Sequence, residues 1–201
     1  MKKGILAGLL AIAFILLGAC LHTKAVSSFD RNIGDFFYGL RSEALTPAVQ
    51  GISELGTTKG YVIALALVLV ITLAMRRWRT AVWLTLGIAT GWLANKALKA
   101  IYNRERPQHW EMLAEPDGSS FPSGNAMVSA AFYGLMALIL LRSEKGGLRA
   151  LGGLLLLAIV IIGLSRLYLG VHYASDIAGG FIAGSCIALL CYMGWKASEK
   201  K

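Results

Sequence analysis

Residues 150–165 read ALGGLLLLAIVIIGLS, an apolar run without a charged side chain. A helix needs about 20 mostly apolar residues to cross a bilayer, within a range of about 17–25. Comparable runs occupy residues 4–21, 60–75, 80–98, 126–141 and 177–195, and the shorter runs need flanking residues to reach that length. Because backbone groups in hydrocarbon must be bonded internally, such runs form helices. The sequence therefore predicts an all-α, polytopic membrane protein with six transmembrane helices, in a single domain over residues 1–201.

The composition supports the same class. Of the 201 residues, 56% are hydrophobic and 15% are charged, and the mean hydropathy is +0.62. Soluble globular chains are about 45–50% apolar and about 25% charged. These values exclude an ordinary cytosolic domain. They also exclude intrinsic disorder, which requires low hydrophobicity and high net charge.

The formal net charge of +9 predicts the orientation of the helices. In a six-helix topology both termini and the second and fourth connections lie on one side. These four segments hold 11 of the 20 Lys and Arg residues and two of the 11 acidic residues, which accounts for the whole excess. Short segments rich in Lys and Arg stay in the cytoplasm. Both termini are therefore predicted to be cytoplasmic, and the scattered excess argues against nucleic acid as a partner.

Residues 22–59 form the longest outward connection. Its apolar positions recur at spacings of three and four: Phe29, Ile33, Phe36, Phe37 and Leu40. This recurrence predicts an amphipathic helix at the membrane interface, and a second short helix is expected over residues 47–55. The segment is expected either to cover the end of the bundle or to border an entrance for lipid.

The first apolar run has an alternative interpretation. Lys2 and Lys3 precede an apolar stretch that ends in LGAC at residues 17–20, a pattern that resembles a lipoprotein signal peptide. Such a signal would be removed from the mature protein. We favour an uncleaved first helix, which keeps the predicted topology.

Polar residues cluster in two stretches at the predicted outer boundary of the membrane. The first stretch runs from Lys99 through Arg104 and Arg106 to Ser123, Gly124 and Asn125, and the second holds Arg166, His172 and Asp176. Each alone has a structural explanation, since a long cation can extend to the interface and a serine can cap a helix. Together, three cations, a hydroxyl and the N–H groups of a helix N-terminus are suited to a phosphate group.

His172 and Asp176 are four residues apart and would share one face of a helix. The carboxylate can accept the Nδ1 proton and leave Nε2 free as a nucleophile. No cluster in the sequence has the spacing of metal ligands. Three cations can supply the charge stabilisation that a metal would otherwise provide.

The order of these motifs identifies a family resemblance. The motifs are Lys99-x6-Arg106-Pro107, then Pro122-Ser123-Gly124, then Ser165-Arg166-x5-His172-x3-Asp176. They resemble the three-part signature of the type 2 phosphatidic acid phosphatase (PAP2) superfamily. By motif the resemblance covers about residues 50–180, and it extends to the six-helix membrane branch of that family.

The resemblance implies a mechanism. Phosphate would be held by Lys99, Arg106, Ser123, the Gly124 N–H group and Arg166. His172 would attack phosphorus to form a phosphohistidine, Asp176 would orient His172, and water would release phosphate. The resemblance also implies an outward-facing site and no need for a metal or another cofactor.

Position 125 departs from the family pattern, which has histidine there as the general acid. Asn125 can donate a hydrogen bond but cannot deliver a proton near neutral pH. The loss of a positioned acid costs about 10²–10⁴-fold in rate. Asn125 is interpreted as either an engineered inactivating change or a natural variant. Four titratable residues of the same connection are interpreted as solvated loop charges, with replacement of the acid by one of them as the alternative: His109, Glu111, Glu115 and Asp117.

The sequence therefore predicts a membrane lipid phosphatase of the bacterial inner membrane, impaired by Asn125. By resemblance, the expected substrates are undecaprenyl diphosphate, phosphatidylglycerol phosphate or phosphatidic acid. The alternative is a non-catalytic lipid-phosphate binder or a lipid transporter, which Asn125 favours and the His172–Asp176 pair opposes. The bilayer is the expected partner, and an oligomer is compatible with the sequence.

Overall fold

The computed structural model describes residues 2–116 and 118–199. Within these residues it contains eight α-helices and no strand. The helices are α1 (Lys2–Cys20), α2 (Lys24–Gly39), α3 (Thr46–Glu54), α4 (Thr58–Ala74), α5 (Trp78–Tyr102), α6 (Gly124–Leu140), α7 (Gly146–Tyr168) and α8 (Ala174–Ser198). The all-helical class is as predicted, and the longer helices correspond to the six apolar runs.

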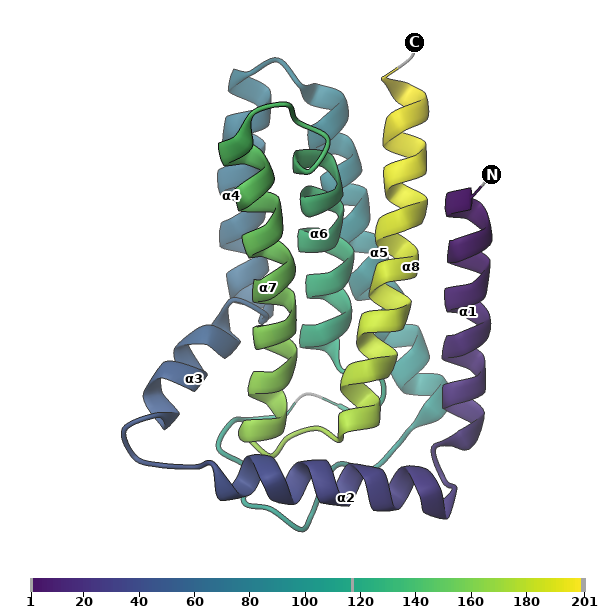
Figure 1. Ribbon diagram of the computed structural model, residues 1–201, viewed down its shortest axis with the longest axis vertical. Coiled ribbons are helices and arrows are strands. Elements are labelled where there is room, and N and C mark those ends of the chain that lie inside the picture. The colour runs from purple at the N-terminus through teal and green to yellow at the C-terminus, as the bar shows by residue number, and fades with distance from the viewer. Residues whose placement is uncertain (1, 117, 200–201) are drawn as a thin grey trace.

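The helices α1, α4, α5, α6, α7 and α8 run side by side as a bundle (Figure 1). α2 lies across one end of this bundle, and α3 lies at the same end. α1 and α8 pack against each other in opposite directions, so the two chain termini lie together at the other end. The connections between α4 and α5 and between α6 and α7 also lie at that end.

Three of the described helices are long and apolar enough to cross a membrane: α1, α7 and α8. A fourth span results if α3 and α4, which meet at a bend of 54°, are taken together. The predicted number of six spans is therefore not confirmed. α6 is apolar but has only 17 residues. α5 carries polar residues in its second half, among them Asn95, Lys96 and Lys99, which lower its hydropathy.

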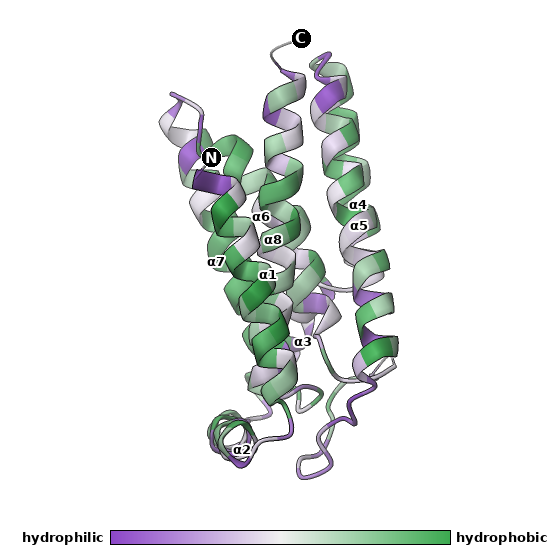
Figure 2. Cartoon of the chain, turned by 90° about the vertical axis from the view of Figure 1, so that its right-hand side faces the viewer, coloured by the Kyte–Doolittle hydropathy of each residue, from purple (hydrophilic) through white to green (hydrophobic). Residues whose placement is uncertain are grey.

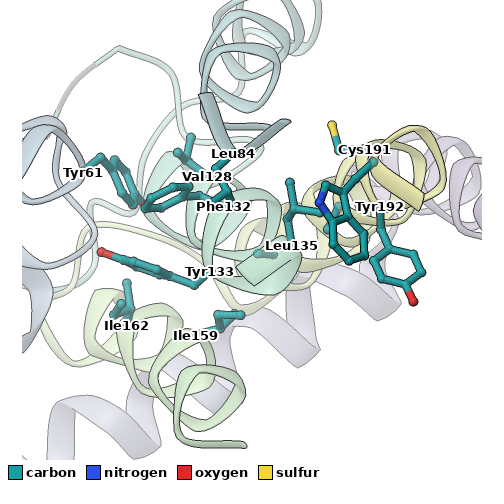
Figure 3. Packing of buried hydrophobic residues seen from close by; sticks show 13 residues of the cluster. Tyr61, Leu84, Val128, Phe132, Tyr133, Leu135, Ile159, Ile162, Cys191 and Tyr192 are labelled. Carbon is teal, nitrogen blue, oxygen red and sulfur yellow. The ribbon is translucent and has the colours of Figure 1, made fainter. Parts of the chain in front are cut away.

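α6 occupies the centre of the bundle, where it packs against α5, α7 and α8. Its residues Val128, Phe132 and Leu135 are buried. Figure 3 shows side chains of the neighbouring helices around it: Tyr61, Leu84, Ile159, Ile162 and Tyr192. The burial of this apolar surface fixes the position of α6 relative to its neighbours.

Glycines bring α8 close to α6. A Cβ atom at Gly184 would lie 2.2 Å from the carbonyl oxygen of Met127, and one at Gly180 would lie 2.8 Å from that of Ser123. Small residues of this kind allow membrane helices to approach closely. As a result the N-termini of the two helices meet, and the Ser123 N–H group donates to the Asp176 carbonyl at 3.1 Å.

α2 is amphipathic, as predicted, and covers the end of the bundle by packing against α7 and α8. Its buried face carries Asp30 and Gly34, whereas Phe29 and Phe36 are exposed. The ring of Trp110 packs at Gly34, where even a Cβ atom would lie 2.1 Å from the ring. Figure 2 shows hydrophobic residues along the helices and hydrophilic residues gathered at the ends and in the connections.

Candidate active site

A cavity of about 910 Å³ opens between α3, α4, α5, α6 and α7, at the end of the bundle near α2. Six of the eight residues predicted from the sequence line it: Lys99, Arg106, Gly124, Asn125, Arg166 and His172. The other two, Ser123 and Asp176, are fully buried beside it. The fold therefore assembles motifs that span more than seventy residues of sequence around one cavity.

Three cations of the predicted site converge on this cavity, which Lys96 of α5 also lines. Lys99 lies in the last turn of α5, Arg166 lies in the last turn of α7, and Arg106 lies in the connection that follows α5. The hydrogen bonds that orient them include Lys99 Nζ to Ser119 O (2.6 Å), Arg106 Nη1 to Val171 O (2.7 Å) and Arg166 Nη1 to Ser53 Oγ (2.6 Å). Such a set of donors is suited to the oxygens of a phosphate group.

The start of α6 supplies further donors. Ser123 is the N-cap residue, and Gly124 and Asn125 form the first turn, whose N–H groups have no partner within the helix. A helix N-terminus attracts anions because of these groups and the helix dipole. Among the described residues, Ser123 Oγ and Arg166 Nε are buried without a hydrogen-bond partner. Arg166 lines the cavity, so its Nε atom is placed to donate to an anion there.

His172 lies in the short connection between α7 and α8 and is 3% exposed. Its Nδ1 atom is 3.4 Å from Asp176 Oδ2, and its Nε2 atom is 3.4 Å from Arg106 Nη1. The carboxylate therefore lies on the Nδ1 side of the ring, and Nε2 lies beside Arg106. This arrangement leaves Nε2 available to attack an electrophile held in the cavity.

Burial lowers the pKa of His172 to about 4, because the imidazolium ion loses its hydration. Asp176 opposes this shift, whereas Arg106 and Arg166 reinforce it. The imidazole is therefore neutral at physiological pH. A neutral imidazole is the form that a nucleophile requires.

A second polar cluster lies behind His172, and its pairing was missed by the sequence analysis. Arg104 bridges two carboxylates, donating to Asp30 Oδ2 at 2.8 Å and to Asp176 Oδ1 at 2.6 Å. Burial lowers the pKa of Arg104, but the two carboxylates outweigh this effect and raise it overall. Ser120 Oγ and the Tyr173 N–H group donate to Asp176 Oδ2. Asp30 lies in α2, 146 positions before Asp176, so no local spacing could have paired them.

Asn125 is bonded to a different part of the chain. The side-chain Nδ2 atom of Asn125 donates to the backbone carbonyl of Ser53 at 3.3 Å. The backbone carbonyl of Asn125 accepts from Tyr61 Oη at 2.9 Å. Of the residues considered as replacement acids, Glu115 lines the cavity, whereas His109 and Glu111 do not. Asp117 lies outside the described residues.

The fold and the site define a class: a helical membrane protein with a cationic cavity suited to phosphate and a buried His–Asp pair beside it. Within the described ranges, no three His, Cys, Asp or Glu side chains are grouped as a metal site would require. The model of the PAP2 superfamily matches residues 80–200, so the chain belongs to this superfamily.

Similar proteins extend the comparison to the rest of the chain. Phosphatidylglycerophosphatase B of Bacillus subtilis (strain 168) is 32% identical over 190 residues, 90% of each chain. Lipid A 1-phosphatase of Rhizobium etli is 28% identical over 122 residues, which are 56% of this chain and 49% of that protein. Both relatives are named as phosphatases of lipids.

Two solved structures share the fold. The transmembrane PAP2 type phosphatidylglycerolphosphate phosphatase of Bacillus subtilis superposes with a TM-score of 0.86 at 28% identity, over 100% of this chain and 97% of that one. LpxE of Aquifex aeolicus superposes with a TM-score of 0.66 at 24% identity, over 82% and 94%. The likeness to LpxE concerns the fold alone, whereas the first structure supports a membrane PAP2 fold over the whole chain.

Proposed function

We propose that the protein is an integral membrane lipid phosphatase that hydrolyses a lipid phosphate or diphosphate through a phosphohistidine at His172. One observation carries this proposal: Nε2 of the neutral His172 lies beside Arg106 at the cavity, while Asp176 holds Nδ1. A site that only bound phosphate would need the cations but no buried carboxylate behind the imidazole.

In the proposed mechanism, Lys99, Arg106 and Arg166 bind the non-bridging phosphate oxygens. Nε2 of His172 forms a bond to phosphorus as the bond to the leaving oxygen breaks, and Asp176 stabilises the positive charge that develops on the ring. The leaving oxygen takes its proton from solvent, because Asn125 has none to give. Water then attacks phosphorus, which releases phosphate and restores His172.

The proposed substrate is a lipid headgroup ending in phosphate, with phosphatidylglycerol phosphate, undecaprenyl diphosphate and phosphatidic acid as the candidates. The relative with 32% identity over nine-tenths of the chain is named for the first of these. Asn125 favours a diphosphate, because a leaving phosphate is a far weaker base than an alkoxide and has less need of a general acid.

We place the protein in the bacterial inner membrane, with both termini cytoplasmic and the cavity facing outward. The charge excess of the four predicted cytoplasmic segments supports this orientation. The common location of the two termini, opposite the cavity, agrees with it.

A second candidate function is binding or transport of a lipid phosphate without hydrolysis. Asn125 favours it, because a binding site has no use for a general acid. Transport would move lipid across the bilayer of reconstituted vesicles without release of phosphate.

Phosphate release by the purified protein in vesicles tests the proposal. Each of the three lipids is supplied in turn, with a metal chelator present, to the protein with Asn125 and to Asn125→His. We expect release from at least one lipid, and no release after His172→Ala. If neither protein releases phosphate from any lipid while lipid crosses the bilayer, the transport function replaces the phosphatase.

A further inference from the structure

Asp30 in α2 is 1% exposed, although a carboxylate is costly to bury unless it is paired. It accepts three described hydrogen bonds, from Arg104 Nη2 (2.8 Å), the Ser175 N–H group (2.8 Å) and Ser175 Oγ (2.6 Å). Ser175 directly precedes Asp176. Asp30 therefore fastens α2 to the first turn of α8, beside the residue that holds His172.

Arg104 completes the connection. Its Nη1 atom donates to Asp176 Oδ1 and to Ser175 Oγ, and its guanidinium lies 4.3 Å from the centre of the Tyr173 ring. Asp176 thus has one oxygen on Arg104 and the other toward His172 Nδ1. A carboxylate held at both oxygens cannot rotate away from the imidazole.

The charges of this cluster matter as well as its geometry. Arg104 alone would neutralise Asp176 and weaken its effect on the imidazole ring. Asp30 supplies a second negative charge, so the three side chains together keep a net charge of −1 behind His172. The cluster can therefore anchor the carboxylate and still stabilise a positive ring.

We propose that Asp30 and Arg104 are positioning residues, which hold Asp176 in the orientation and charge state that His172 needs for attack. The inference rests on the proposed phosphatase function. It assigns α2, which lies outside the family motifs, a part in the chemistry.

Turnover is the first test, with a matched control on the same helix. Asp35 of α2 also accepts a side-chain hydrogen bond, from Trp110 Nε1 at 2.8 Å. Unlike Asp30, it is exposed and makes no described contact with Asp176. Displacement of a reacting group by about 1 Å can cost about 100-fold in rate. We expect Arg104→Gln and Asp30→Asn to lower kcat about 10- to 100-fold with KM changed less than about two-fold, and Asp35→Asn to retain the kcat of the unmutated protein.

A double-mutant cycle separates positioning from general loss of structure. If Arg104 acts through Asp176, Arg104→Gln should lower kcat less than about two-fold in an Asp176→Asn background, because its target is already lost. An equal loss in both backgrounds would overturn the proposal. If Arg104→Gln does not fold, Arg104→Lys replaces it in the same double-mutant cycle. Lysine keeps the positive charge but lacks the two guanidinium NH₂ groups that bond to the two carboxylates.

Binding of two inorganic anions gives a readout that does not depend on turnover. Orthovanadate takes the five-coordinate geometry of the transition state when it bonds to a nucleophile, whereas inorganic phosphate needs only the cations. By titration calorimetry, we expect Asp30→Asn and Arg104→Gln to weaken vanadate binding at least about 10-fold and to leave phosphate binding within about two-fold.

The two hypotheses fail in different ways. Absence of phosphate release from every lipid, by both the protein with Asn125 and Asn125→His, would reject the phosphatase function. The vanadate-to-phosphate ratio would still test the positioning of His172. Variants that match Asp35→Asn in kcat and in this ratio would reject the positioning role. A parallel loss of vanadate and phosphate binding would also reject it, because the whole cavity would then be disturbed.

Discussion

The two ends of the bundle use charge differently. At the end with the termini, basic residues such as Arg77, Lys145 and Arg149 are exposed. The segments predicted to lie there carry the whole net charge of +9. The rest of the sequence holds nine basic and nine acidic residues. Within it, Arg104 forms two buried ion pairs, and the three cations of the predicted site meet at one cavity. The sum of charges thus predicts orientation, whereas the chemistry depends on how individual charges are placed.

The largest effect expected at the cavity end comes from His172→Ala. Without the proposed nucleophile the site keeps only its proposed phosphate-binding groups, and comparable deletions cost about 10⁴-fold or more in turnover. Phosphate release from vesicles measures the loss. His109→Ala is the matched control, because His109 is exposed and does not line the cavity. Comparable activity of the two variants would remove His172 from the mechanism.

Asn125→His is expected to raise turnover, and by different amounts for the two kinds of substrate. A restored general acid should accelerate hydrolysis of a lipid monophosphate by about 10²–10⁴-fold, because its leaving group is an alkoxide. The gain on a polyprenyl diphosphate should be much smaller, since that leaving group needs no proton. The ratio of the two gains is the measurement, and equal gains would contradict the role given to position 125.

The family motifs explain why so much of the site could be predicted. Lys99, Arg106, Arg166 and His172 were predicted to share a phosphate site, and the structure brings them to one cavity. The helices could also be predicted from the sequence, because apolar runs must form helices in a membrane. The number of membrane spans was harder to predict, since the 17 residues of α6 are close to the shortest length that can cross a bilayer.

The partners of the site residues could not be predicted. Arg104 stands in the predicted polar cluster, but its partner Asp30 is 74 positions away in a helix whose pattern shows only amphipathicity. Ser53, which accepts from Arg166, comes from the end of α3. Helical periodicity relates residues three or four apart, whereas these pairs depend on how α2 and α3 fold back over the bundle.

The pH dependence of stability tests the burial of His172. Its pKa is about 4 in the folded protein and about 6.5 in an unfolded chain, so between these values the unfolded state binds more protons. The contribution of the buried, neutral imidazole to the free energy of unfolding is fully present above about pH 6.5. It is lost as the pH falls toward 4, by about 3 kcal/mol in all. Thermal midpoints in detergent should therefore fall more steeply with acid for the unmutated protein than for His172→Gln. Parallel curves would show that the ring is hydrated.

The smallest effects are expected at the end with the termini. Lys145 and Arg149 are exposed, so Lys145→Gln combined with Arg149→Gln should change turnover less than about two-fold and stability by about 0.5 kcal/mol or less. Removal of two cations from the cavity, Lys99→Gln with Arg166→Gln, should by contrast lower turnover at least about 10²-fold. In the proposed mechanism each of these donors faces the charge that develops in the transition state. Both pairs remove two positive charges, so only their location differs. A large loss from the first pair would mean that net charge, and not its arrangement, controls activity.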